Sequence, residues 1–108
     1  MKIRFYRRSD REALQSYQLT DLRFTSHPKE AVADLENRYA ILGLEEDQIV
    51  TFLILDAGEE KYTYGGQPDS LLLRSLSTDE NFQMRGYGSQ TLKLLLDFIR
   101  EHLPMYKS

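Results

Sequence analysis

The chain of 108 residues contains no cysteine, and this absence removes several kinds of chemistry. Without a thiol there is no disulfide, no thiolate metal site and no cysteine nucleophile. The absence also fits a cytoplasmic protein, because disulfides persist chiefly in oxidising compartments. We expect a cytoplasmic protein, and we assign no metal ligands.

Long apolar runs are missing as well. The longest, residues 49–55, is far shorter than the run of about 20 residues that a membrane-spanning helix needs. The N-terminal sequence MKIRFYRR leads into a charged segment, which argues against a secretory signal. No membrane partner is expected.

Neither sign of charge is in large excess. The formal net charge is −3, and the basic residues are scattered apart from a cluster of Arg4, Arg7, Arg8 and Arg11. A mildly acidic chain gains little attraction to a phosphate backbone, so no nucleic-acid partner is predicted. The length suffices for one compact core, and residues 1–108 are therefore expected to form a single domain.

The N-terminal third alternates first like a strand and then like a helix. Within residues 2–8, Ile3 and Phe5 alternate with Arg4 and Tyr6, which predicts a strand with one buried face. Ser9 and Glu12 match a capping box, and Leu14 and Tyr17 begin an apolar stripe, so a helix of about three turns should follow. A second, short helix is predicted from Pro28 through Leu35, ending near Asn37.

The middle of the chain predicts a hairpin. Residues 38–44 and 48–56 are strand-like, and residues 45–47 form the turn between them. The second strand is apolar without alternation over residues 49–55, which predicts burial on both faces and a central place in the sheet. Residues 57–69 are polar and contain glycine, as in a loop, with room for a short extended excursion at residues 62–64.

A fourth strand and a long helix complete the pattern. The strand is predicted over residues 70–77 and the helix over residues 86–103, with Pro104 as its stop. One apolar helix face is expected to contain Leu92, Leu95, Leu96, Ile99 and Leu103. The order β-α-α-β-β-β-α indicates an α+β fold, with a mixed, mainly antiparallel sheet and flanking helices.

Two glycines stand at the start of this long helix, although each costs about 1 kcal/mol against alanine inside a helix. Gly86 and Gly88 would let an anion approach the unpaired N–H groups of the first turn. An NTPase phosphate loop would need Gly-Lys-Ser/Thr, but the chain has Gly88-Ser89-Gln90. A dinucleotide fingerprint would need glycine or alanine at position 91, which is Thr91.

The run Gln83-Met84-Arg85-Gly86-Tyr87-Gly88 has the form Gln/Arg-x-x-Gly-x-Gly/Ala. It resembles the acetyl-coenzyme A (acetyl-CoA) signature of the GNAT N-acetyltransferase superfamily. The likeness extends upstream through residues 76–83, with Phe82 at the usual aromatic position, although Glu80 replaces a common proline and Thr78 a common valine. The order of elements is also similar to the first two-thirds of that fold, which implies a GNAT-like acyl-CoA N-acyltransferase core.

The resemblance implies acetyl-CoA as co-substrate and a primary amine, on a small molecule or a peptide, as acceptor. It places the pyrophosphate at the main-chain N–H groups of residues 84–89 and the pantetheine amides along the edge of the fourth strand. A main-chain N–H near residues 76–78 would polarise the thioester carbonyl. Arg85 is read equally well as a phosphate contact or as a solvated side chain. The expected cofactor-binding residues are Leu76, Ser77, Thr78, Gln83, Met84, Arg85, Gly86, Tyr87, Gly88 and Ser89.

No catalytic base can be assigned from the sequence. The fourth strand offers Arg74 and Ser75 where related proteins often have a glutamate. Glu45 and Glu46 are interpreted as solvated turn charges and Asp79 and Glu80 as loop charges. His27 and His102 are likewise interpreted without a catalytic role.

The family's fold normally continues with a fifth strand, which this chain is expected to lack at its C-terminal end. The fourth strand would then have an unpaired edge, which a homodimer or strand exchange could cover. A fragment, a short form completed by a second copy, and a degenerate domain all remain open. The functional alternatives are accordingly an N-acetyltransferase, a non-catalytic acetyl-CoA-binding or assembly module, and a structural domain whose glycines only permit close packing.

Overall fold

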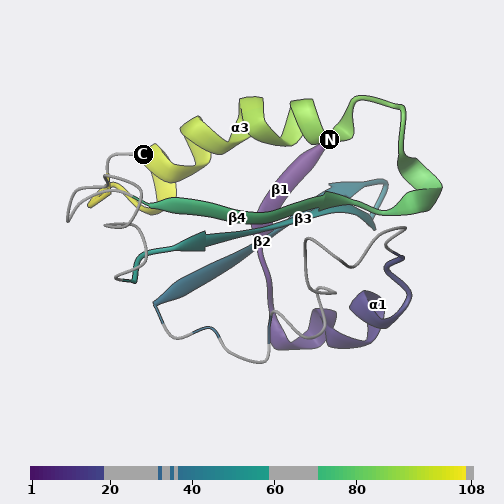
Figure 1. Ribbon diagram of the computed structural model, residues 1–108, viewed down its shortest axis with the longest axis horizontal. Helices are drawn as coiled ribbons and strands as arrows, with labels where there is room; N and C mark the ends of the chain where they lie inside the picture. The colour runs from purple at the N-terminus through teal and green to yellow at the C-terminus, as the bar shows by residue number, and fades with distance from the viewer. Residues whose placement is uncertain (19–31, 33–34, 36, 59–70, 107–108) are drawn as a thin grey trace.

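The computed structural model describes residues 1–18, 32, 35, 37–58 and 71–106. Four strands form one sheet in the order β1-β2-β3-β4, namely β1 (Lys2–Phe5), β2 (Arg38–Glu45), β3 (Gln48–Asp56) and β4 (Leu72–Thr78). Helix α1 (Arg11–Gln15) lies on one face of this sheet and helix α3 (Tyr87–His102) on the other (Figure 1). Two 3₁₀ helices, η1 (Arg8–Asp10) and η3 (Glu80–Phe82), precede them. The α+β class is as predicted, but each described strand pair is antiparallel, so a mixed sheet is not observed.

The first strand is shorter than predicted because of Asp10. β1 ends at Phe5, and the Asp10 carboxylate accepts hydrogen bonds from both terminal nitrogens of Arg4, each at 2.7 Å. The same carboxylate accepts from the main-chain N–H of Arg7 at 2.7 Å. These bonds turn the chain away from the sheet before Arg8, the predicted end of the strand.

The first helix also differs from its prediction. Ser9 lies inside η1, so the predicted capping box of Ser9 and Glu12 is wrong, and α1 has 5 residues instead of about three turns. The predicted apolar stripe is correct at its start, since Leu14 and Tyr17 are both buried against the sheet. The second predicted helix, residues 28–35, falls almost entirely outside the described residues, as does the excursion at residues 62–64.

The hairpin of β2 and β3 is as predicted, with a tighter turn. Only Glu46 and Asp47 separate the strands, and their φ values of 50° and 68° are both positive, as a two-residue turn that matches the twist of the strands requires. β3 has the predicted bounds, pairs with β2 and β4, and is buried from Val50 to Asp56. Its predicted central position is confirmed.

β4 is displaced toward its C-terminal end relative to the prediction, and it contains a bulge. It runs to Thr78, one residue beyond the predicted end, whereas Ser70 lies outside the described residues. Its register against β3 shifts between the Phe52–Ser77 pair and the Ile54–Arg74 pair. Ser75 has a φ of 57°, so the extra residue lies there and bends the strand just before Leu76.

The long helix is close to its predicted bounds, but its buried face is rotated. Thr91, Leu95, Phe98 and Ile99 are buried, and Leu103 follows them against the same sheet face. Leu92 and Leu96, predicted on this face, are 41% and 51% exposed. Adjacent helix positions differ by about 100°, so the leucines of this helix cover more of its surface than one face can bury. Thr91 and Phe98 are on the side that is buried.

Candidate functional site

The glycine-containing segment is where β4 passes into α3. Between Thr78 and Tyr87 the chain makes η3 and then a turn that leaves the sheet edge (Figure 1). Gly86 is the N-cap of α3 and has a φ of 77°, and Met84 is also left-handed with a φ of 67°. A non-glycine residue held in this conformation is uncommon and recurs at ligand-binding turns.

The two glycines meet different requirements. Gly86 is required by its left-handed conformation and not by a lack of space, because a Cβ there would meet nothing within 4 Å. Gly88 has an ordinary helical conformation, and a Cβ there would lie 3.6 Å from the Thr78 hydroxyl, an ordinary contact. Packing within the described chain therefore does not require glycine at position 88, which weakens the interpretation of these glycines as packing residues.

The main-chain N–H groups of this turn are available to a ligand. The first intrahelical bond of α3 runs from the Gln90 N–H to the Gly86 carbonyl, at 3.0 Å. Within the described part of the chain, no carbonyl or side chain accepts from the main-chain N–H groups of residues 86–89. Together with the positive end of the helix macrodipole, these groups form a site suited to an anion.

A hollow of about 340 Å³ lies beside these groups. Most of the residues predicted to bind cofactor line it, namely Leu76, Ser77, Thr78, Gln83, Met84, Gly86, Tyr87 and Gly88. Arg85 and Ser89, also predicted, do not line it. The Arg85 guanidinium instead lies over the Phe82 ring, 5.6 Å from its centroid, and so places a positive charge at the edge of the hollow.

Buried hydroxyl groups hold the first turn of α3 against the sheet. The Thr91 hydroxyl donates to the Tyr87 carbonyl at 2.8 Å and also lies 2.8 Å from the Thr51 hydroxyl on β3. Thr51 and Thr91 are both buried. The direction of the helix N-terminus is therefore set by β3, independently of the glycine turn.

The end of α1 is bonded to the other side of the same segment. The Tyr17 hydroxyl lies 2.8 Å from the Ser77 hydroxyl on β4. The Gln18 N–H donates to the Asp79 carboxylate at 2.9 Å, and the Glu80 N–H donates to the Gln18 carbonyl at 2.9 Å. Burial raises the pKa of Tyr17 well above its usual range, so the phenol stays neutral and hydrogen-bonded.

Comparison with known proteins decides the family. A protein of Bacillus subtilis (strain 168) named uncharacterized N-acetyltransferase YbbJ is 36% identical over 110 aligned residues, covering 96% of this chain and 69% of that protein. The chain belongs to the GNAT N-acetyltransferase superfamily. No model of a known protein family matches the chain.

This relationship gives the protein an N-acetyltransferase role at the level of its family. Within the residues that the structure describes, no helix is long and apolar enough to cross a bilayer. The catalytic base of this N-acetyltransferase remains unassigned, because the described lining of the glycine hollow contains no carboxylate and no histidine.

The candidate bases lie elsewhere or carry other bonds. Glu45 forms an ion pair with the N-terminal amino group at 3.6 Å, and Glu46 is exposed in the hairpin turn. His102 packs against Phe98 at the opposite end of α3, with ring centroids 4.5 Å apart, and His27 lies outside the described residues. None of the described candidates lines the glycine hollow.

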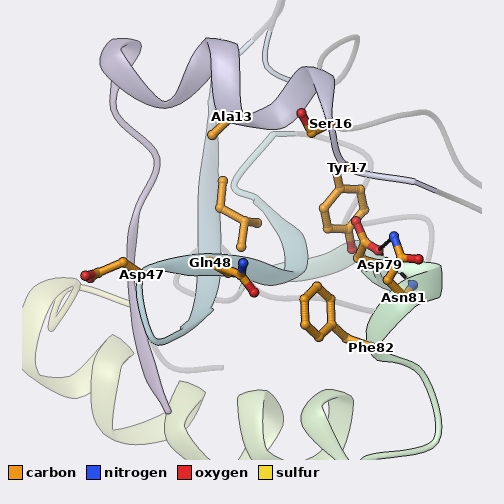
Figure 2. Close-up of a pocket in the computed structure, with 9 residues that line it drawn as sticks. Ala13, Ser16, Tyr17, Asp47, Gln48, Asp79, Asn81 and Phe82 are labelled. Carbon is orange, nitrogen blue, oxygen red and sulfur yellow. Dashed lines mark hydrogen bonds between the residues drawn. The ribbon is translucent and has the colours of Figure 1, made fainter.

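Two residues beside the glycine turn were given no functional role from the sequence. Asp79, interpreted as a solvated loop charge, is only 4% exposed and is the N-cap of η3, where its carboxylate accepts from the main-chain N–H of Asn81 at 2.8 Å (Figure 2). Phe82, noted only as an aromatic position, lines the glycine hollow. The sequence did contain a signal for Asp79. An aspartate at a chain reversal often accepts a hydrogen bond from the main-chain N–H two residues later, an arrangement called an Asx turn.

Proposed function

We propose that this N-acetyltransferase takes its acetyl group from acetyl-CoA and transfers it to a primary amine. The observation that carries the proposal is the set of main-chain N–H groups at residues 86–89, which have no acceptor among the described residues and lie at the N-terminus of α3 beside a hollow. A diphosphate fits such a cradle because it is dianionic and accepts several N–H bonds at once. Gly88 supports the fit, since its missing side chain leaves room that internal packing does not need.

The cofactor-binding residues that we propose are those expected from the sequence, residues 76–78 and 83–89. The β4 edge that faces away from β3 has no partner strand among the described residues, and Leu76, Ser77 and Thr78 border the hollow there. An extended chain with amide groups, such as pantetheine, can pair with an open strand edge as another strand would. The bulge at Ser75 redirects the main chain at the point where this edge begins.

Acetyl-CoA would supply an acetyl group activated as a thioester. The chain would bind the diphosphate at the glycine turn and offer a main-chain N–H of β4 to the carbonyl oxygen as negative charge develops on it. The amine must arrive neutral, so its ammonium proton has to pass to a base or a water chain first. Arg85 would add a positive charge at the mouth of the hollow.

Titration calorimetry with coenzyme A tests the donor site directly. Gly88→Glu should abolish binding, because it adds bulk and a negative charge beside the cradle, whereas Gly88→Gln, of nearly equal size, isolates the effect of bulk. Gly88→Ala should fold normally and bind with reduced affinity. If the unaltered chain does not bind coenzyme A, or if Gly88→Glu binds it equally well, the proposed site is wrong.

Turnover is measured separately, as release of free thiol from acetyl-CoA with a panel of primary amines. Thiol release that depends on the amine supports the transferase. Binding without release favours a non-catalytic coenzyme-binding module. A cytoplasmic location and a homodimer or strand exchange covering the β4 edge stay predictions, the latter open to analytical ultracentrifugation.

A further inference from the structure

A second hollow, of about 470 Å³, lies on the α1 side of the sheet (Figure 2). It is bounded by α1, the start of β3 and η3, and Phe82 separates it from the glycine hollow, since this ring lines both. Its apolar wall contains Ala13, Ile49 and Phe82, and its polar wall contains Gln48, Asn81 and Asp79. No activity considered above makes use of it.

Asp79 distinguishes this hollow from an ordinary surface depression. Buried carboxylates usually carry a cationic partner, and two others in this chain do. Asp10 pairs with Arg4 at 2.7 Å, and Asp56 pairs with Arg38 and Arg74, each at 3.2 Å. Asp79 is equally buried, yet among the described residues it is bonded only to neutral N–H groups, from Gln18 and Asn81.

The bonding of the Asp79 carboxylate leaves capacity for one more donor. Its Oδ1 accepts both Asn81 bonds, whereas its Oδ2 accepts from one described donor, the Gln18 N–H. A carboxylate oxygen has two lone-pair sites, so Oδ2 can accept again. A cationic donor there would neutralise a charge that the described chain leaves uncompensated.

The other lining residues also favour a positively charged ligand. Asp47 adds an exposed carboxylate at the rim, and the lining residues that the structure describes include no lysine, arginine or histidine. Arg85 contacts the Phe82 ring but does not line this hollow. An anionic ligand would therefore be repelled, while an ammonium group would be attracted and could also lie against an aromatic face.

We infer that this hollow binds a small organic cation, an ammonium group joined to an apolar body. The ammonium group would be held by Asp79, and the apolar body would contact Ile49, Ala13 and Phe82. The inference concerns a site separate from the glycine cradle and does not depend on acetyl-CoA binding.

Nuclear magnetic resonance of the full chain without coenzyme tests this site with three probes. Benzylamine, protonated at neutral pH, should shift the side-chain amide signals of Gln48 and Asn81, with a dissociation constant of about 1 mM. Neutral benzyl alcohol and anionic phenylacetate should bind at least about tenfold more weakly. Equal shifts with all three probes, or none at about 10 mM benzylamine, would overturn the inference.

Variants at Gln48 give the matched comparison, because its side chain is exposed at the start of β3. Gln48→Lys places a competing ammonium in the hollow and should weaken benzylamine binding about tenfold or more, read from the Asn81 signal. Gln48→Met, of similar length but uncharged, should change it much less. Asp79→Asn should also lose binding. If that variant does not fold, the comparison of Gln48→Lys with Gln48→Met still tests the site. Unchanged benzylamine affinity in Gln48→Lys would reject it.

Adding acetyl-CoA distinguishes the two possible sources of such a cation. Acetylation of the amine, detected by mass spectrometry and lost in Gln48→Lys, identifies the bound cation as the acceptor. Binding without acetylation identifies a regulatory ligand. Both results support the site, and the benzylamine titration without coenzyme tests it independently of whether the glycine turn binds coenzyme A.

Discussion

The hydroxyl groups of Tyr17 and Ser77 lie 2.8 Å apart and join the end of α1 to β4, although 60 positions separate them in the sequence. Tyr17 is 3% exposed, so its hydroxyl depends on protein partners rather than on water. The contact fixes β4 one residue before Thr78, whose hydroxyl faces Gly88. The face of the sheet opposite α3 thus helps to position the strand that leads into the glycine turn.

Replacing Tyr17 with phenylalanine should lower the free energy of unfolding by about 1 kcal/mol, because one buried hydrogen bond is lost. Urea denaturation measures this loss. Tyr39→Phe is the matched control, since it removes the Tyr39–Tyr106 hydroxyl contact of 3.2 Å far from the glycine turn. We expect only Tyr17→Phe to weaken coenzyme A binding. Equal effects of the two variants on binding would contradict this.

The same tyrosine should make the folded protein sensitive to alkali. In the unfolded chain Tyr17 ionises near pH 10, whereas burial raises its pKa in the folded chain. A raised folded pKa contributes stability that is complete below about pH 10 and declines as the pH rises above it. Stability measured from pH 8 to about 11 should therefore fall less steeply in Tyr17→Phe than in the unaltered chain. Identical slopes would show that Tyr17 ionises normally.

Acid sensitivity should depend on Asp56. Burial alone would raise the pKa of this carboxyl, but the Gly58 N–H at 2.7 Å and the guanidinium groups of Arg74 and Arg38 outweigh burial and lower it. A lowered folded pKa gives stability above the unfolded value of about 3.9, which is lost as the pH falls through the folded pKa.

Asp56→Asn should therefore reduce stability at pH 7 by about 2 kcal/mol and flatten its decline at acid pH. Both arginines are partly exposed, which keeps the expected loss below that of a fully buried ion pair. Guanidinium chloride adds salt that screens charges, so urea denaturation between about pH 2 and 7 is the suitable measurement. An unchanged acid decline in Asp56→Asn would contradict the assignment.

The sequence predicted the parts of this fold that local patterns determine. The second strand of the hairpin has its predicted bounds, and the long helix begins within one residue of its predicted start. In both cases the apolar pattern and the glycine or charged turn beside it indicate the same boundary. The glycine turn at the start of the long helix was predicted for the same reason, because Gly86 meets a local main-chain requirement, a positive φ.

The errors occur where distant residues decide. Asp10 ends β1 early through its bonds to Arg4, and no local pattern indicates that pairing. Leu92 and Leu96 look like core residues until Thr91 bonds to Thr51 and rotates the helix face. Asp79 is buried because the end of α1 packs beside η3, which is a tertiary relationship that no local pattern indicates.

Gly86 should tolerate only residues that adopt a left-handed conformation. Its φ of 77° predicts that Gly86→Ala costs about 1 kcal/mol, while Gly86→Asn costs less. Open space around the missing Cβ means that any loss arises from the main chain and not from a clash. Thermal unfolding of the two variants measures this difference, and a stable Gly86→Ala would show that the turn can adopt another conformation.

The Arg4–Asp10 pair should resist conservative replacement. Both terminal nitrogens of Arg4 donate to the carboxylate at 2.7 Å, which holds the pKa of Asp10 below its usual range. Lysine offers one ammonium instead of a planar fork, so Arg4→Lys should lose about 1 kcal/mol. Arg4→Met should lose more, because it leaves a buried carboxylate with only the Arg7 N–H as a donor among the bonds described.

A double-mutant cycle of Arg4→Met and Asp10→Asn, followed by urea denaturation, isolates the pair itself. We expect a coupling free energy of about 1 to 2 kcal/mol, since the geometry is bidentate and Asp10 is buried. The coupling should fall only slightly in added salt, because burial limits screening. A coupling near zero would mean that the Arg7 N–H and the helix alone hold Asp10, and that Arg4 contributes only its contact with the sheet.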